Sequence, residues 1–259
     1  MSKSIYYTDY RWPELQELAK KDPIIIIPIG QVEEHGPHLP VGTDVTISEE
    51  TARLIAEKAQ DEMSVLVMPT IWAGFSGQGL FKWPGTISLP QEIVAATLEH
   101  IILSLNKSNF KKIVILNSHG HHEGIMKIAM RRIADQCKLT VVGSNIWRMA
   151  EEVVTEVRES EEGGCCHAGE YETSVMLAMN KRVDLSEAVD EPVKPHSQFV
   201  GGDLITRHNA KVYWSTFGHS SSKTGTFGCP TKATKEKGEI IMQRTVEEYM
   251  KLMREINQA

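Results

Sequence analysis

Three side chains that could bind a divalent metal lie within twelve residues near the start of the chain, at Glu33, His35 and Asp44. Glu33 and His35 follow an apolar run, residues 24–29, that is typical of a buried strand. Residues two apart on an extended backbone point to the same side, so we expect this carboxylate and imidazole to face the same way. Asp44 returns after a loop rich in glycine and proline. An ordinary polar loop is the alternative, but two carboxylates and an imidazole in so short a segment favour a metal site.

A second polar group follows another apolar run, residues 112–116, and contains three histidines between Asn117 and Glu123. A single histidine at this place would be typical of a helix cap or of the core. Three histidines at the end of a strand favour at least one metal ligand, and His119 is the first after the strand.

A third group begins at His167 and continues with Glu170 and Ser174, which lie on one face if the segment is helical. The alternative is a solvated helix start, where carboxylates are favoured by the helix dipole. Residues 225–230 are rich in turn formers and by themselves predict only a turn. Cys165 and Cys166 beside His167 could suggest a thiolate–zinc site, but no second cysteine pair at finger spacing supports it.

The elements that must position these groups alternate between strand and helix. Short apolar strands separated by helical segments predict an α/β fold, with a mostly parallel sheet covered by helices on both faces. In such sheets, ligands bind beyond the carboxyl ends of the strands. The polar groups that follow the strands lie at these ends, so we expect one active site there. The expected strands are residues 24–29, 65–68, 112–116 and 139–142, and the expected helices are residues 47–61, 90–107, 123–137, 170–179 and 234–255.

The composition is that of an ordinary soluble globular protein. A chain of 259 residues fits one domain, residues 1–259, with a substantial core. A net charge of −6 argues against a nucleic-acid or anionic-membrane surface. We expect no membrane span, no signal peptide, and four reduced cysteines in a cytoplasmic protein.

The motifs together resemble those of the creatininase (creatinine amidohydrolase) family. They occur in the family's order and span nearly the whole chain, although each would be weak evidence alone. The resemblance rests on residues 33–44, 84–89, 117–120, 167–174 and 232–239. It implies a three-layer α/β/α domain, a homo-oligomer that is commonly a hexamer, and a site for two divalent ions. Zinc or manganese suits these ligands, and iron is compatible with them.

Carried over by position, the family's metal ligands fall on four residues of this chain. Glu33 and His119 would hold one ion, His35 the other, and Asp44 would bridge them. The family's further glutamate is replaced here by His121. The resemblance therefore leaves the last ligand open, with the following order of preference: Glu170, then His121 or Glu123.

The resemblance also implies a mechanism. Paired divalent ions lower the pKa of a bound water from about 15.7 toward about 7, and one ion can polarise the scissile carbonyl. His167 matches the family's catalytic histidine, and it or a nearby carboxylate such as Glu170 would transfer the proton. The expected activity is hydrolysis of a cyclic amide or a related small carbonyl compound. Alternatives are hydrolysis of a formamide, cleavage of a carbon–carbon bond in a keto-inositol such as 3-dehydro-scyllo-inosose, or a metal-binding subunit without catalysis.

The residues expected around the substrate depart from creatininase. Gly163 stands where that enzyme has one active-site tryptophan, and Trp147 keeps a plausible equivalent of the other. Loss of an aromatic wall argues against a flat heterocycle such as creatinine. Lys82 replaces a histidine and, if it faces the metals, makes the pocket more polar. The expected substrate contacts are Ser76, Lys82, His121 and Trp147, and His196, His208 and His219 offer further polar groups.

Overall fold

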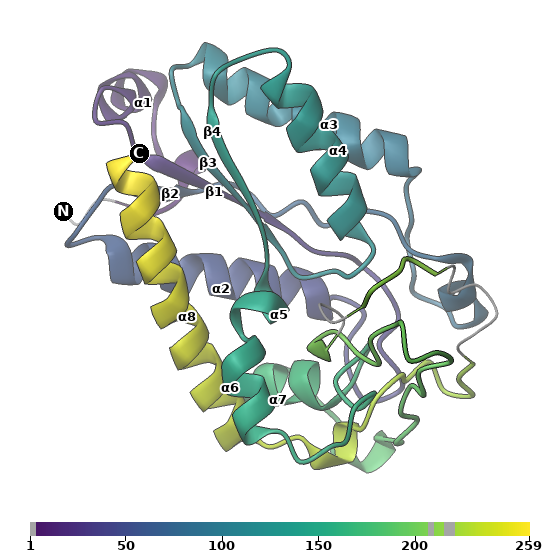
Figure 1. The fold of residues 1–259 in the computed structure, drawn as a ribbon. Helices are drawn as coiled ribbons and strands as arrows, with labels where there is room; N and C mark the ends of the chain where they lie inside the picture. The colour runs from purple at the N-terminus through teal and green to yellow at the C-terminus, as the bar shows by residue number, and fades with distance from the viewer. Residues whose placement is uncertain (1–3, 207–209, 215–220) are drawn as a thin grey trace.

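The structure is a computed structural model that describes residues 4–206, 210–214 and 221–259. Its centre is a parallel sheet of four strands in the order β2-β1-β3-β4 (Figure 1). The parallel sheet confirms the predicted fold class. The strands are β1 (Ile24–Ile29), β2 (Val65–Val67), β3 (Lys112–Asn117) and β4 (Thr140–Asn145).

The apolar run of β1 is continuous because both faces of the sheet are covered. Ile24 and Ile26 pack into one hydrophobic core, and Ile25 and Ile27 pack into the core on the opposite face. All four side chains are at most 1% exposed. One strand thus supplies both cores, and helices must lie on both sides of it.

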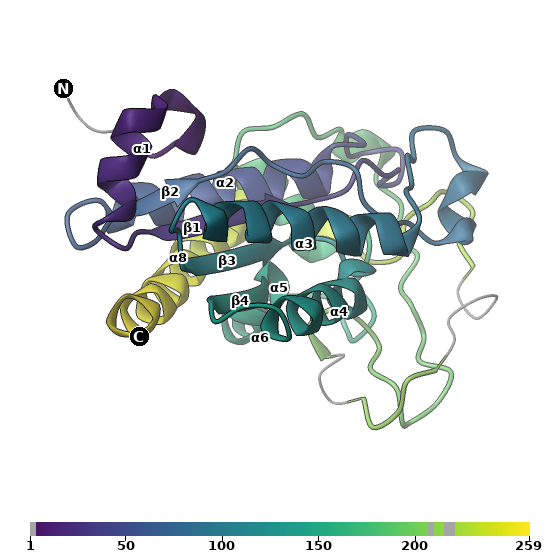
Figure 2. The same cartoon turned by 90° about the horizontal axis from the view of Figure 1, so that it is seen from above.

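Helices do cover both faces, which gives three layers (Figure 2). The core with Ile25 takes side chains from α1, α3 and α4, and the core with Ile24 takes them from α2 and from α5 to α8. The helices are α1 (Trp12–Ala19), α2 (Thr43–Ala59), α3 (Gln91–Lys107), α4 (His122–Ala134), α5 (Ile146–Met149), α6 (Glu151–Val157), α7 (Glu170–Ala178) and α8 (Lys235–Gln258), with short 3-10 helices at Tyr7–Asp9, Gln78–Lys82, Leu185–Glu187 and Pro230–Lys232.

Two features of the helices differ from the sequence prediction. Helix α2 begins at Thr43, four residues earlier than expected, so Asp44 lies in its first turn and not in a loop. An acidic side chain there is stabilised by the helix dipole. Helices α1, α5 and α6 are short elements that the apolar pattern did not reveal.

The strand register brings the polar groups to one edge of the sheet. Ile29 of β1 pairs with Asn117 of β3, which in turn pairs with Asn145 of β4. The chain after β1, which carries Glu33, therefore leaves the sheet beside the chain after β3, which carries His119. This confirms that the polar groups after β1 and β3 converge.

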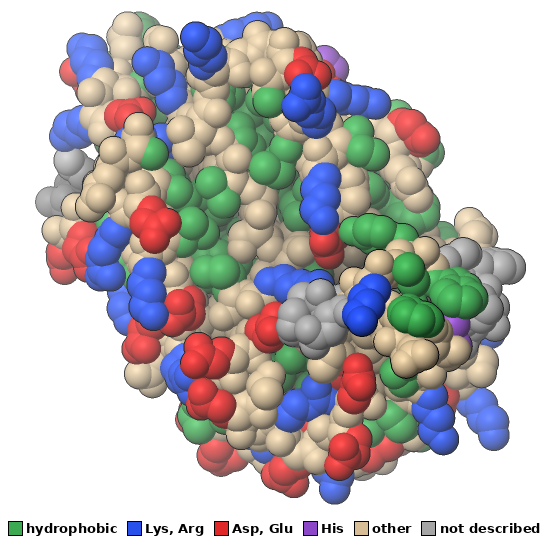
Figure 3. Space-filling view, in the orientation of Figure 1, with side chains coloured by type: hydrophobic (Ala, Val, Ile, Leu, Met, Phe, Trp, Pro, Cys, Tyr) green, Lys and Arg blue, Asp and Glu red, His purple; other side chains and the backbone are tan. Residues whose placement is uncertain are grey.

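Two observations concern membrane spans and the charge of the surface. Across the described part of the chain, no helix is both long enough and apolar enough to span a bilayer. On the face shown in Figure 3, basic and acidic side chains are interspersed and form no large area of one sign.

Asp203 is a buried carboxylate that organises the segment before His167. It accepts hydrogen bonds from Arg158 Nη2 at 2.9 Å, from the Gly163 N–H at 2.9 Å and from the Thr206 N–H at 3.1 Å. Burial by itself raises the pKa of Asp203, but Arg158 and the backbone N–H groups lower it further than burial raises it, so the pKa lies below its usual range. A carboxylate with a lowered pKa stabilises the fold above the unfolded pKa, about 3.9, and loses this effect as the pH falls.

The substitution Asp203→Asn should therefore destabilise the protein most at neutral pH. We expect the free energy of unfolding at pH 7 to fall by about 3 kcal/mol, because the Arg158 guanidinium, only 11% exposed, would lose its charge partner. The difference from the wild type should shrink as the pH falls through the native pKa of Asp203. Urea unfolding at pH 7 and near pH 3 measures both values, and equal differences at the two pH values would contradict the argument.

Candidate metal centre

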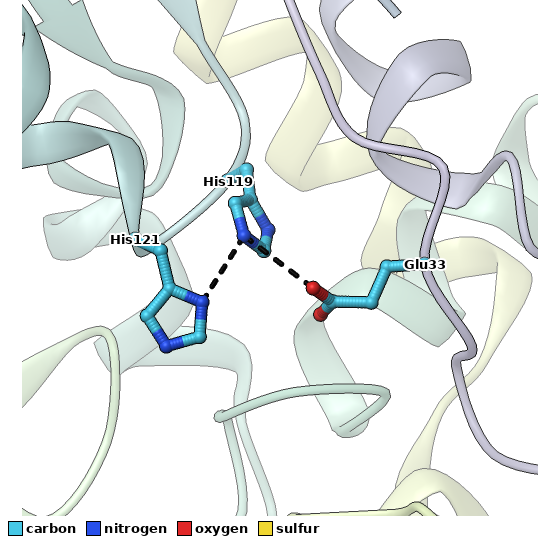
Figure 4. A group of neighbouring side chains, drawn as sticks. All are labelled: Glu33, His119 and His121. Atoms are coloured by element: carbon cyan, nitrogen blue, oxygen red, sulfur yellow. Dashed lines mark hydrogen bonds and ion pairs between the residues drawn. The ribbon is translucent and has the colours of Figure 1, made fainter. Parts of the chain in front are cut away.

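Glu33, His119 and His121 form the first group of metal-binding side chains (Figure 4). Their ligand atoms all lie within 4.8 Å of one another. His119 Nε2 is 3.5 Å from Glu33 Oε2 and 3.2 Å from His121 Nδ1. Glu33 comes from the segment after β1, and both histidines come from the segment between β3 and α4. The sequence left the role of His121 open, and the structure places it beside Glu33 and His119.

His35, His167 and Glu172 form the second group, again with ligand atoms within 4.8 Å of one another. His35 Nε2 is 3.9 Å from Glu172 Oε2, and the rings of His35 and His167 lie 4.3 Å apart. Glu172 belongs to the first turn of α7, and His167 lies just before this helix. This group thus joins the segment after β1 to a segment well over a hundred residues away.

Asp44 lies between the two groups. One of its oxygens, Oδ1, is 3.3 Å from His35 Nε2, and the other, Oδ2, is 2.8 Å from His119 Nδ1. Its side chain is 1% exposed. A carboxylate that contacts one histidine of each group has the arrangement that a bridging ligand needs.

The electrostatics of the site show an excess of buried negative charge. Burial by itself lowers the pKa of His35, but Asp44, Glu172 and Glu33 raise it to about 10. Burial likewise opposes the charge on His119, and Glu33 and Asp44 raise its pKa to about 9. The carboxylates thus favour the charged form of both imidazoles, and a divalent ion would balance the same negative charge.

The unpaired polar atoms of the site fit a divalent cation. Among the described residues, both carboxylate oxygens of Glu33 and the Nε2 atom of His35 are buried without a hydrogen-bond partner. Leaving such groups buried and unpaired is costly unless they are ligands or are paired with charge. Carboxylate and imidazole donors in this mixture suit zinc, manganese or iron.

Glu170, the first choice for the additional ligand, faces away from both groups. Its carboxylate accepts hydrogen bonds from the N–H groups of Glu159 and Ser160 at 2.9 and 2.8 Å, and from Lys237 Nζ at 2.7 Å. It thus anchors the turn before the site to α7 and α8. Glu172 provides the carboxylate beside His35 instead. The other alternative, Glu123, is paired on the surface of α4 with Lys127 at 2.8 Å.

This geometry predicts opposite outcomes for two matched substitutions. Glu172→Gln should weaken metal binding by about 10-fold to 100-fold, because it removes a charged group beside His35. Glu170→Gln should keep the metal and lower the free energy of unfolding, because Lys237 and two N–H groups lose their charged acceptor. Metal content after dialysis and urea unfolding separate the two effects. If Glu170→Gln lost its metal while Glu172→Gln kept it, this assignment would be contradicted.

Three other polar side chains, His122, Ser76 and Gln31, hold the loops around the site. His122 donates from Nδ1 to Asn117 Oδ1 at 3.2 Å, and its Nε2 accepts the Phe75 N–H at 3.1 Å. Burial, helped by His119, lowers its pKa well below the usual value. Ser76 was expected to touch substrate, but it is 1% exposed and its Oγ accepts a hydrogen bond from Gln31 at 2.5 Å. Gln31, which the sequence analysis missed, also accepts the Gly74 N–H through its side-chain oxygen.

Lys82 and Trp147 lie differently from expectation, whereas Gly163 agrees with the expected absence of an aromatic wall. Lys82 is exposed, with its Nζ 5.8 Å from the centre of the Trp83 ring, and it belongs to neither group. The argument that Lys82 changes the polarity of the pocket therefore fails. Trp147 is 2% exposed and packs in the hydrophobic core. Gly163 has a φ of +97°, and a Cβ there would lie 1.8 Å from the carbonyl oxygen of Val193, so no aromatic side chain fits.

The loop after residue 224, predicted only as a turn, forms one side of the site. The Phe227 N–H donates to the His167 carbonyl at 2.9 Å, and the two rings lie 6.0 Å apart. In the sequence, the only sign of this role was that Gly225 and Gly228 flank the aromatic residue Phe227. His196 is exposed and lies against Trp214, whereas His208 and His219 lie outside the described residues.

Comparison with known proteins agrees with this geometry. The family model described as creatinine amidohydrolase matches residues 8–253. The chain is 29% identical to the creatinine amidohydrolase of Pseudomonas putida, over 98% of each chain. It is 28% identical to the 3-dehydro-scyllo-inosose hydrolase of Thermotoga maritima, over 97% of this chain and 83% of that protein. A solved mutant creatininase of the Zn–Zn type superposes with a TM-score of 0.81 at 25% identity, over 98% of each chain. Since the family model matches nearly the whole chain, the protein belongs to the creatininase family and is a hydrolase.

Proposed function

We propose that this protein is a divalent-metal-dependent hydrolase of a small carbonyl substrate, either a cyclic amide or a polyhydroxylated cyclic ketone. The observation that carries the proposal is the contact of Asp44 with one histidine of each metal-binding group. Two such groups on one carboxylate are the arrangement of a two-metal hydrolytic site.

The residues that would hold the ions follow from the two groups. Glu33, His119 and His121 would hold one ion, His35 and Glu172 the other, and Asp44 would contact both. Zinc is our first choice, since a solved family member is a Zn–Zn form, and manganese and iron are compatible with the ligands. Bound divalent ions would supply Lewis acidity and a nucleophilic water at neutral pH.

His167 is the residue we propose for proton transfer. Its side chain is 15% exposed, whereas that of His35 is fully buried, so His167 can meet both solvent and substrate. Its Nδ1 lies 3.3 Å from Glu33 Oε1, on the side of the metal-binding groups. A histidine in this place can take a proton and give it to a leaving group.

Substrate choice is the finer part of the proposal. Val193 fills the space beside Gly163, so this side of the site has no aromatic wall on which a flat heterocycle could stack. We therefore expect the protein to be a poor creatininase. Stacking accounts for only about 0.5–1.5 kcal/mol, so the missing wall alone predicts a loss of about tenfold or somewhat less.

The test is kcat/KM for creatinine, a formamide and a polyhydroxylated cyclic ketone, each measured on zinc-loaded protein with product masses. We expect the ketone to be the best of the three, in agreement with the relative named as an inosose hydrolase. Efficient turnover of creatinine with no turnover of the ketone would show that the missing wall does not set specificity.

We also infer a cytoplasmic homo-oligomer. Cys137, Cys165, Cys166 and Cys229 are in no disulfide, as is usual in a reducing compartment. Exposed apolar side chains such as Trp72, Phe81 and Ile93 suit a subunit interface. Light scattering coupled to size-exclusion chromatography measures the oligomeric state, for which the family resemblance suggests a hexamer.

A further inference from the structure

The backbone at Ala168, directly after His167, has a conformation that residues other than glycine rarely adopt. In the described part of the chain, four such residues have a positive φ: Asp22 at +50°, Asn109 at +65°, Asn180 at +51° and Ala168 at +52°. The first three follow the C-terminal ends of α1, α3 and α7, where aspartate and asparagine tolerate the left-handed conformation. Ala168 instead precedes α7, and its methyl group offers no polar contact to offset the strain. The ordinary end of a helix therefore does not explain its conformation.

The peptide group between His167 and Ala168 is bound on both sides. Its carbonyl oxygen accepts the Phe227 N–H at 2.9 Å. Its N–H donates to Glu172 Oε2 at 2.6 Å. These two partners come from separate segments, the loop after residue 224 and the first turn of α7. Because both polar atoms of the peptide group are held, its plane cannot rotate without the loss of a hydrogen bond.

The side chain of Ala168 is fixed as firmly as its backbone. It is 0% exposed and belongs to the hydrophobic core that contains Ile24. In a close-packed core, the methyl group fixes the direction of the Cα–Cβ bond. Glycine would adopt the same φ without strain, but it would also be free to leave it, since nothing would anchor it in the core. Strain of this kind persists where the surroundings hold it, typically at sites that need pre-organised groups.

We propose that Ala168 is a positioning residue, whose buried methyl group and left-handed backbone hold the imidazole of His167 beside the metal-binding groups. His167 Nδ1 is 3.3 Å from Glu33 Oε1, and the His167 ring lies 4.3 Å from the ring of His35. A side chain on a backbone with one conformation keeps such distances, whereas a backbone that can rotate lets the ring leave them. The link from this geometry to turnover rests on the proposed function, in which His167 transfers a proton.

Ala168→Gly separates positioning from folding. Glycine relieves the strain and loses a buried methyl group, and because these effects oppose each other we expect the urea midpoint to stay close to the wild-type value. The freed backbone should lower kcat by about 10-fold to 100-fold, with a much smaller change in KM and unchanged zinc content. Ala168→Ser, which keeps the Cβ atom, should have a kcat within a few-fold of the wild type. Asn109→Gly is the matched control, since it places glycine at an exposed left-handed position before the amino end of β3.

The order of the His167 ring is measured by relaxation of the ring ¹³Cε1 atom in full-length protein with ¹³C-labelled histidine. Samples are taken with zinc and after its removal, and His167→Gln assigns the signal. Without zinc, we expect the ring of wild-type His167 to be as ordered as that of the buried His35, and the ring in Ala168→Gly to move more.

A mobile His167 ring in the zinc-free wild type would overturn the positioning role even if no variant folds. An equally ordered ring in folded Ala168→Gly would overturn it as well. Increased ring motion without any loss of kcat would leave the positioning role in place and count against His167 as the group that transfers the proton. The NMR result thus stands whether or not the protein hydrolyses a tested substrate.

Discussion

Replacing Asp44 with alanine should remove divalent metal from both groups at once. Each oxygen of Asp44 contacts a histidine of a different group, at 3.3 Å for His35 and 2.8 Å for His119. Among the described carboxylates, only Asp44 and Glu33 have an ion-pair contact with a histidine of each group. Glu33 contacts His119 and His167. We therefore expect zinc content to fall from about two ions per chain to well below one, with activity lost to the same extent.

Elemental analysis of zinc-reconstituted, dialysed protein measures this directly. Thermal unfolding provides a second readout, because a ligand at 100 times its Kd stabilises the native state by about 2.7 kcal/mol. Zinc should raise the Tm of the wild type and leave that of Asp44→Ala nearly unchanged. Asp61→Ala, at an exposed position beyond the end of α2, is the control for loss of an acidic residue. Retention of two ions per chain by Asp44→Ala would rule out the bridging role.

Replacing His167 with glutamine should lower kcat by about 10²-fold to 10⁴-fold, which is the usual contribution of a positioned acid or base. The metal content should stay close to that of the wild type. His167 is the most exposed member of its group, at 15%, and His35, Glu172 and Asp44 would remain to hold the ion. Because glutamine cannot carry the proton at neutral pH, KM should change much less than kcat.

The informative comparison is metal content against kcat in the same preparation. His100→Gln, on the exposed face of α3, controls for loss of a histidine. If His167→Gln loses one ion per chain along with its activity, His167 is a metal ligand and not the group that transfers the proton. A kcat within a few-fold of the wild-type value would show that His167 takes no part in the chemical step.

The sequence by itself determined the sheet and the first half of the site. The run of isoleucines in β1 could be buried only in a strand covered on both faces, and the observed strand has the expected bounds, Ile24–Ile29. Glu33, His35 and His119 follow strands whose carboxyl ends must meet in a parallel sheet, so their convergence followed from local pattern and topology. The residue pattern also singled out Asp44 and His167, the family resemblance added their bridging and catalytic roles, and the structure places both in contact with these residues.

Only the tertiary structure decided which neighbouring residues face the site. Glu170 and Glu172 differ by two positions on a helix, which turns their side chains about 200° apart, so the exact start of α7 determines which carboxylate reaches His35. Lys82 and the loop with Gly225 depend on how segments distant in sequence pack, and local periodicity carries no information about that packing. The sequence identified the groups that could do the chemistry, and packing across long separations selected those that come together.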